Sequence, residues 1–287
     1  MQVYLNGQYM PLGQACVPVL DRGFLFGDGV YEVIPVYGGH PFRLQQHLDR
    51  LESSLKAISI PSPHSAEEWK HIFQGLIDTV PDQDSSLYLQ VTRGVAPRDH
   101  TFPEFVRPTV FVMLNPIKPV SAEVLRTGIK AVVREDIRWD RCDIKSISLL
   151  GNVLLKQEAV EAGAAETILI RNGLVTEGSI SNIFVVKTGE IITPAKDQLL
   201  LGGVTRDLVL ELARKHGLPV REAEIRELIL RAADEIWTTS STREVLPVTM
   251  LDGNPVGDGK PGPVWETIRA LYSQCKEKLR QGQDACT

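Results

Sequence analysis

Two residues of this chain have the types and surroundings needed for chemistry on a carbonyl group. Lys145 lies in the run DIKSISLLGN (143–152), at the mouth of an apolar helix and beside small hydroxyl residues. A lysine amine attacks a carbonyl carbon only when it is uncharged, and partial burial favours the uncharged amine. Glu177 is the single carboxylate in the run TEGSISNIF (176–184), whose other residues are uncharged and mostly small.

Together the two residues predict a site for pyridoxal 5'-phosphate (PLP). This cofactor needs a lysine to hold its aldehyde and an acid to keep its pyridine nitrogen protonated. Each residue also has an ordinary interpretation, since Lys145 alone fits a solvated helix-cap lysine and Glu177 alone fits a turn glutamate. The hypothesis therefore depends on the other parts of a PLP site, above all on a place for the phosphate.

A place for a phosphate is indicated by the run LGGVTRD (201–207), in which two glycines and a threonine precede a helix. Backbone N–H groups and the helix dipole favour an anion there, although a plain helix N-cap has the same pattern. The hydroxyls of residues 239–242, among them Ser240 and Ser241, and the guanidinium of Arg50 are further candidates. A polar loop and a surface ion pair are the alternatives. The chain has no GxxxxGK[ST] motif, which disfavours nucleoside triphosphate binding by a P-loop.

The glycine- and proline-containing run TRGVAPRDH (92–100) offers a site for a carboxylate. Arg98 and His100 stand two positions apart, so their side chains suit charge-assisted hydrogen bonds to the two oxygens of one carboxylate. A solvated loop is the alternative. Tyr31 is a further candidate, because its phenol suits donation to the same carboxylate. Packing within a sheet is the alternative.

Composition narrows the class of protein. The 287 residues carry a formal net charge of −5 and no basic stripe, which argues against nucleic acid as the partner. No apolar run approaches the roughly 20 residues that span a bilayer, and the N-terminus lacks the pattern of a signal peptide. Four widely separated cysteines predict reduced thiols rather than disulfides or a metal site. We therefore expect a cytoplasmic enzyme without a metal; the cysteines are Cys16, Cys142, Cys275 and Cys286.

Hydrophobic periodicity and turn residues predict two α/β halves. We expect a pair of short strands around Asn6-Gly7, further strands at 30–37, 87–92, 109–114, 129–135, 167–171, 180–187 and 235–239, and helices at 41–58, 66–80, 148–162, 205–216, 225–233 and 264–279. Asn172-Gly173 is expected to make the turn of a strand pair formed by 167–171 and 180–187. The prediction is a mixed α/β (α+β type) fold with an N-terminal domain at 1–116, a linker at 117–121 and a C-terminal domain at 122–287. A doubly wound sheet would need steadier strand–helix alternation and a glycine-rich first turn.

Taken together, these runs resemble the fold-type IV (class IV) PLP-dependent aminotransferases, and within that family the group that acts on D-amino acids. The resemblance extends nearly from end to end. It is carried by runs at 21–33 (including DRG and FGDGVYEV), 47–51 (HLDRL), 91–94 (VTRG), 138–146 (RW and RCDIKS), 176–182 (TEG and SN) and 203–206 (GVTR). The resemblance implies a two-domain architecture with the cofactor between the domains.

The resemblance also implies a role for each candidate residue. Lys145 would be the Schiff-base lysine and Glu177 the partner of the pyridine nitrogen. The phosphate would be held by Arg50, by the backbone amides of Val204 and Thr205, and by Ser240 and Ser241. The substrate α-carboxylate would be bound by Tyr31, Arg98 and His100, with the Arg98 loop donated by a second subunit, which implies an obligate homodimer.

The implied reaction is ping-pong transamination between a D-amino acid, D-alanine above all, and a 2-oxo acid, 2-oxoglutarate above all. A branched-chain L-amino-acid aminotransferase is one alternative. That group usually has the pattern Glu-Gly-x-Gly-x-Asn, and this chain has Ile180 at the position of the second glycine. A lyase similar to aminodeoxychorismate lyase is the other alternative, and an Arg-x-His pair is not expected there. Arg243, beside the hydroxyl run, is expected to influence which substrate side chains are accepted.

Overall fold

The computed structural model describes residues 1–80 and 83–283, which fall into two units of mixed α/β structure. Unit 1 contains Met1–Ile117, Ile144–Leu149 and Leu279–Gln283, and unit 2 contains Lys118–Asp143 and Leu150–Lys278. The expected α/β class is confirmed. The segment that carries Lys145 lies in unit 1, whereas the division drawn from the sequence assigned it to the C-terminal half.

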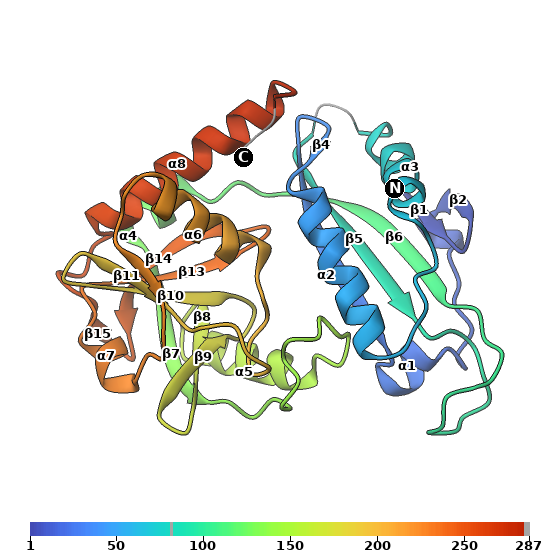
Figure 1. Ribbon diagram of the computed structural model, residues 1–287, viewed down its shortest axis with the longest axis horizontal. Coiled ribbons are helices and arrows are strands. Elements are labelled where there is room, and N and C mark those ends of the chain that lie inside the picture. The colour runs from blue at the N-terminus through green and yellow to red at the C-terminus, as the bar shows by residue number, and fades with distance from the viewer. Residues whose placement is uncertain (81–82, 284–287) are drawn as a thin grey trace. The chain divides into compact units, whose positions relative to one another are not determined.

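Unit 1 is built on a six-stranded antiparallel sheet with the strand order β2-β1-β6-β5-β3-β4. Its strands are β1 (Gln2–Leu5), β2 (Gln8–Pro11), β3 (Gly29–Tyr37), β4 (His40–Pro41), β5 (Ser85–Thr92) and β6 (Thr109–Pro116). Its helices are the 3-10 turn η1 (Leu12–Gln14), α1 (Arg22–Phe26), α2 (Leu44–Ala57) and α3 (Ala66–Ile77). Figure 1 shows α2 and α3 beside this sheet, and their apolar side chains share one core with it.

Local sequence accounts for both long helices of unit 1. In α2, Leu48, Leu51 and Leu55 recur at the spacing of one helix face and are buried, as the periodicity predicts. The helix α3 begins with a capping box, in which the Ser65 hydroxyl accepts from the Glu68 backbone and the Glu68 carboxylate accepts from the Ser65 backbone. Together these helices bury one long face of the sheet and fix the position of β3.

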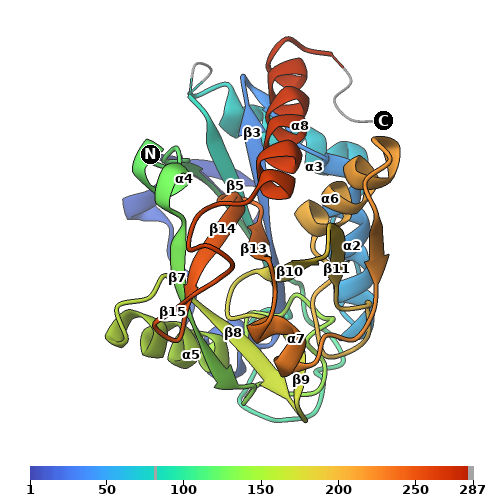
Figure 2. The ribbon, with the colours of Figure 1, turned by 90° about the vertical axis from the view of Figure 1, so that its left-hand side faces the viewer.

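Unit 2 is built on a nine-stranded mixed sheet with the order β12-β11-β10-β13-β14-β7-β8-β9, and β15 pairs with β14. Its strands are β7 (Ile129–Glu135), β8 (Glu166–Arg171), β9 (Leu174–Gly178), β10 (Asn182–Lys187), β11 (Glu190–Thr193), β12 (Val220–Glu222), β13 (Glu235–Ser240), β14 (Glu244–Leu251) and β15 (Asn254–Pro255). Its helices are α4 (Ala122–Thr127), α5 (Leu150–Glu161), α6 (Val204–Lys215), α7 (Glu227–Arg231) and most of α8 (Pro263–Arg280). Figure 2 shows α5 beside β7 and β8, against which it packs.

The expected pairing of 167–171 with 180–187 is wrong. Asn172 and Gly173 both have positive φ, at 53° and 76°, and they join β8 directly to β9 in a tight hairpin. The strand β10 pairs instead with β11 and β13. Residues 174–178 form a strand, so Glu177 lies on a strand and not in a loop. The sequence did not reveal this strand because Thr-Glu-Gly resembles a turn.

The expectation of four reduced thiols is also wrong in part. Cys16 and Cys142 are free, but Cys275 is disulfide-bonded. Cys286 lies outside the described residues, and the cytoplasmic location stays a prediction. Among the described residues, none of the helices is both long and apolar enough to cross a membrane.

Candidate active site

Lys145 is held on unit 1 by backbone contacts with β3 and α2. The backbone N–H of Tyr31 donates to the Lys145 carbonyl at 3.0 Å, and the Lys145 N–H donates to the Ser54 hydroxyl at 3.2 Å. Two positions on, the Ile147 N–H donates to the Gly29 carbonyl. A side chain at Gly29 would come within 2.6 Å of the Val91 carbonyl, so this close approach requires glycine. The lysine is therefore presented by an extended segment that is fixed on both sides.

The Lys145 side chain points at an aromatic surface. Its Nζ lies 4.2 Å from the centre of the Tyr31 ring, and Tyr31 in turn stacks on Tyr88 at 6.0 Å. Burial raises the pKa of the Tyr88 phenol to about 12, and this phenol donates to Gln90 at 2.7 Å. Alternation along β3 places Tyr31 and the buried Glu32 on opposite faces of the sheet. The structure thus brings together two of the predicted residues, Lys145 and Tyr31.

Arg50 is fixed by a buried carboxylate that the sequence analysis did not single out. Its Nε and one terminal nitrogen donate to the two oxygens of Glu32 at 2.8 and 2.7 Å, and Glu32 also accepts from His47 Nδ1 at 2.7 Å. Burial opposes the charge on Glu32, but the Arg50 guanidinium and His47 hold its pKa well below the usual range. Burial lowers the pKa of His47, and the charges of Arg50 and Lys145 act on it in the same direction.

Arg98 and His100 lie in the β5–β6 loop of unit 1, and both side chains are exposed. They meet at one aromatic ring. The Arg98 guanidinium lies 5.4 Å from the centre of the Phe26 ring, and the His100 ring is also 5.4 Å from it. Within residues 1–80 and 83–283, no hydrogen bond, ion pair or ring contact joins either residue to Tyr31 or Lys145.

Glu177 lies on β9 of unit 2, where both of its oxygens have partners. Arg138 donates to one oxygen, while the Asn182 side-chain amide and the Leu201 backbone N–H donate to the other at 3.1 Å each. Burial raises the pKa of the Glu177 carboxyl to about 7 even though the Arg138 guanidinium opposes this shift. A carboxyl with this pKa exchanges a proton readily at neutral pH, which suits a group that shares a proton with a ring nitrogen.

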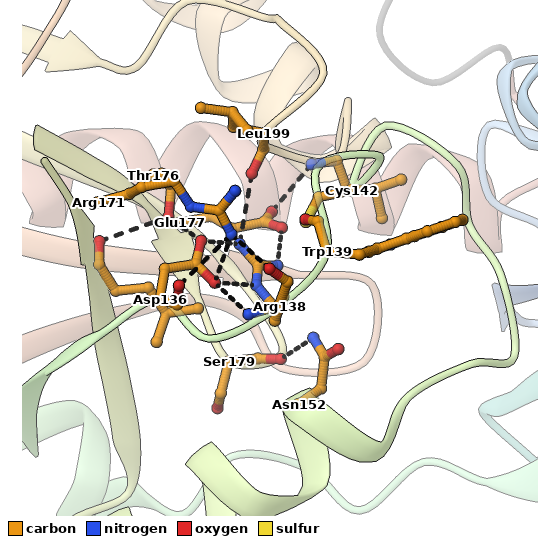
Figure 3. A network of polar contacts seen from close by, with 12 residues as sticks. Asp136, Arg138, Trp139, Cys142, Asn152, Arg171, Thr176, Glu177, Ser179 and Leu199 are labelled. Atoms are coloured by element: carbon orange, nitrogen blue, oxygen red, sulfur yellow. Dashed lines mark hydrogen bonds and ion pairs between the residues drawn. The ribbon is translucent and has the colours of Figure 1, made fainter.

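Arg138 is in turn oriented by Asp136, as Figure 3 shows. The carboxylate of Asp136 accepts from Arg138 Nε and a terminal nitrogen at 2.9 Å each, and from the Thr176 hydroxyl at 2.9 Å. Arg171 adds a second cation at 3.4 Å from Asp136. Although burial opposes its charge, Arg138 keeps the pKa of Asp136 below the usual range. The buried network therefore fixes the position of the guanidinium beside Glu177.

The predicted phosphate cradle is the N-terminus of α6. Gly203 is the N-cap residue, and no side chain caps this end of the helix. A Cβ on Gly203 would lie 2.0 Å from the Asn182 amide oxygen, so glycine is required for this approach. The same Asn182 donates to Glu177 and to the Leu201 carbonyl. One side chain thus connects Glu177 on β9 with the loop that leads into Val204 and Thr205.

The hydroxyl run lies at the end of β13, beside the same asparagine. Thr239 is the register partner of Asn182, and its buried hydroxyl has no hydrogen-bond partner among the described residues. Ser240 and Ser241 follow at the turn into β14 and are half-buried. An uncapped helix N-terminus, a glycine that leaves room beside it and an orphaned hydroxyl form a cradle that fits a phosphate.

The residues present therefore fit PLP. The lysine, the acid and the cradle were predicted from the sequence. Sequence reasoning assigned no role to the residues that fix them, which are Glu32, His47, Asp136, Arg138 and Asn182. A signal existed for Glu32, because a carboxylate inside an apolar strand must have a buried partner.

Comparison with known proteins identifies the class to which this fold and site belong. The model of the amino-transferase class IV family matches residues 29–251. The chain is 44% identical over 269 residues to D-alanine aminotransferase of Bacillus licheniformis, covering 94% of this chain and 95% of the relative. It is 41% identical over 274 residues to D-alanine aminotransferase of Listeria monocytogenes, covering 95% of each chain.

Solved structures agree with this assignment. The branched-chain amino acid aminotransferase of Escherichia coli superposes with a TM-score of 0.88 at 28% identity, covering 95% of this chain and 93% of that one. Another branched-chain amino acid aminotransferase, solved with pyridoxamine 5'-phosphate, gives a TM-score of 0.90 at 27% identity, covering 96% and 93%. The protein belongs to the class IV aminotransferases, and the family resemblance predicted from the sequence is confirmed.

Proposed function

We propose that this enzyme uses PLP to transfer the amino group of a D-amino acid to a 2-oxo acid, with D-alanine and 2-oxoglutarate as its substrates. The observation that carries the choice of substrate is the 44% identity to a D-alanine aminotransferase over 94% of the chain. The solved branched-chain enzymes are only 27–28% identical. The Arg98–His100 pair, which the sequence analysis associates with the D-specific group, supports the same choice.

When bound, PLP supplies an aldehyde that reacts with amines and a ring that accepts electrons from a carbon losing its proton. In this proposal the Lys145 amine would hold the cofactor through its aldehyde. The same amine would move the proton at the substrate Cα. Glu177 keeps the pyridine nitrogen protonated, and its pKa of about 7 suits this task.

The phosphate is assigned to Arg50, to the start of α6 and to the hydroxyls that follow β13. Arg50 supplies a guanidinium that Glu32 already orients, and Val204 and Thr205 supply backbone N–H groups at the start of α6. Ser240 and Ser241 supply hydroxyls beside the orphaned Thr239 hydroxyl. The substrate α-carboxylate is assigned to Tyr31, Arg98 and His100. Arg243, in the turn after Ser241, stays a candidate for discriminating between substrate side chains.

We also propose that the enzyme is an obligate homodimer in which Arg98 and His100 act in the site of the partner subunit. Their exposure on unit 1 supports this assignment. A second supporting observation is the helix α5, which exposes a row of apolar side chains to solvent, namely Leu150, Val153, Leu154 and Val160. Contiguous apolar surface of this kind is typical of protein–protein interfaces.

The reaction is tested with purified, PLP-loaded protein. Pyruvate formation from D-alanine and 2-oxoglutarate is compared with the corresponding reactions of L-alanine and L-leucine. Turnover of D-alanine alone supports the proposal. Turnover of L-leucine contradicts the D-specific assignment and favours the branched-chain reaction, and binding of PLP without transamination favours a lyase.

The dimer is tested by placing a charge on the apolar row. Leu154→Asp should convert the dimer to a monomer in sedimentation experiments. Leu228→Asp is the matched control, since Leu228 is 76% exposed on the separate helix α7 and should leave assembly unchanged. A Leu154→Asp protein that sediments like the wild-type dimer would remove α5 from the interface.

A further inference from the structure

We propose that Arg22 and Phe26, both on the short helix α1, are positioning residues for the Arg98–His100 loop. This inference rests on the proposed function, in which that loop binds the substrate α-carboxylate. No role was assigned to either residue from the sequence. The helix α1 and the β5–β6 loop both belong to unit 1, so every contact involved lies within one unit.

The first contact fixes the loop backbone. Arg22 donates from a terminal nitrogen to the carbonyl oxygen of Asp99 at 2.5 Å, and Asp99 is the residue between Arg98 and His100. A single hydrogen bond at Asp99 therefore limits the orientation of both carboxylate-binding side chains.

The second contact fixes the side chains themselves. Three groups surround the Phe26 ring. The Arg98 guanidinium and the centre of the His100 ring each lie 5.4 Å from the centre of the Phe26 ring, and the Arg22 guanidinium lies 4.9 Å from it. Cations are attracted to the face of an aromatic ring, and the attraction holds a long side chain in place without using its hydrogen-bond donors. The terminal nitrogens of Arg98 are thus left available for a carboxylate while its stem is held.

The position of Arg22 is itself determined by buried ionic contacts. Its side chain is 4% exposed, and its Nε donates to Asp28 at 2.8 Å. Asp28 also accepts from Arg93 at 2.8 and 3.0 Å, and the Arg93 guanidinium lies 3.7 Å from the centre of the Phe102 ring in the same loop. Although burial opposes the charge on Asp28, the two arginines lower its pKa.

This arrangement has a functional consequence because an unbound arginine on a loop samples many rotamers. Fixing a long side chain before binding removes part of the entropic cost of substrate binding. Arg22 and Phe26 do not touch the reacting atoms in this proposal. Their loss should therefore weaken binding of the substrate carboxylate while the chemistry at Lys145 continues.

The test compares steady-state constants for D-alanine in the PLP-loaded dimer. Arg22→Met and Phe26→Leu are each expected to raise KM about tenfold, as loss of a charge-assisted or cation–ring contact implies, with kcat changed less than about threefold. Phe24→Leu is the matched control, because Phe24 lies on the same helix and is 75% exposed. Arg22→Lys should recover part of the affinity, since an ammonium can also donate to the Asp99 carbonyl.

A mutant cycle distinguishes positioning from general damage. Because Arg22 acts through Arg98 and His100 in this proposal, adding Arg22→Met to a variant that carries both Arg98→Ala and His100→Ala should raise KM less than about twofold further. Additive effects of Arg22→Met and the two loop changes, or a fall in kcat with unchanged KM, would overturn the inference. Wild-type protein that turns over L-leucine and not D-alanine would instead overturn the proposed function, so the two failures are distinguishable.

Discussion

The side-chain nitrogen of Lys145 lies 4.2 Å from the centre of the Tyr31 ring, and the two residues are also joined by a backbone hydrogen bond of 3.0 Å. The lysine therefore reaches over an aromatic surface whose position is fixed by the strand β3. This geometry directs a single amine toward one place on unit 1. Tyr31 can therefore have two functions at once. Its ring packs against the Lys145 side chain, and its phenol remains available for the substrate carboxylate.

We predict that Lys145→Ala reduces transamination of D-alanine by at least 10²–10⁴-fold, roughly the contribution of a positioned acid–base group. Lys145→Arg should be equally inactive, since a guanidinium does not provide a neutral nucleophile. Tyr31→Phe keeps the ring and should mainly raise KM. The measurement is pyruvate formation together with the visible absorbance of the bound cofactor. Comparable turnover by Lys145→Ala would remove the lysine from the mechanism.

We predict that Glu177 makes the cofactor-free protein less stable as the pH rises. Its pKa is raised from 4.5 to about 7, so between these values the folded state binds more protons than the unfolded state. The free energy of unfolding should therefore fall through this window, by roughly 3 kcal/mol for this shift. Glu177→Gln should abolish this part of the pH dependence, as measured by urea unfolding between about pH 4.5 and 7.5. An unchanged slope in the variant would show that another group titrates there.

We predict that Glu32 has the opposite pH dependence. Its lowered pKa means that its stabilising contribution is fully present above about pH 4.5 and is lost as the pH falls toward the folded pKa. Glu32→Gln leaves Arg50 and His47 without their carboxylate and should cost about 3–5 kcal/mol at neutral pH.

The control for that change is Glu52→Gln, at an exposed position on α2, which should alter stability by less than about 0.5 kcal/mol. Thermal unfolding at neutral and acidic pH distinguishes the two variants. Since Glu32 orients Arg50, the first variant should also bind PLP more weakly. Equal stability of the Glu32→Gln and Glu52→Gln variants would mean that the contacts of Glu32 with Arg50 and His47 contribute nothing to the free energy of unfolding.

We predict that Lys145→Ala, which is inactive, and Arg98→Ala, which binds the substrate weakly, restore activity at limiting D-alanine when they share a dimer. If Arg98 acts in the partner's site, a mixed dimer of Lys145→Ala and Arg98→Ala chains has one site with both residues intact. Co-expression of equal amounts should therefore recover about a quarter of wild-type activity, because half of the dimers are mixed and each has one working site of two. No recovery in mixed dimers isolated with two different affinity tags would mean that Arg98 acts in its own subunit.

The sequence by itself determined the residues whose role depends on local context. Lys145 stands beside small residues before a helix, and Gly203 precedes the first turn of α6, so both were found from spacing alone. The amphipathic helix α2 and its buried leucines were likewise predicted, because a helix face is read from residues three and four apart. The order of these runs was enough to predict the family.

Only the tertiary structure decided which residues fix the reactive ones. The pairing of β8 with β9 placed Glu177 on a strand. The fold also brought Arg138, which is far from Glu177 in the chain, into contact with the Glu177 carboxylate. In the same way, residues 144–149 lie with unit 1 because their backbone groups bond to β3. Contacts of this kind join residues that are far apart in the chain. The burial that raises the pKa of Glu177 and the Arg50 and His47 contacts that lower the pKa of Glu32 exist only in the folded state.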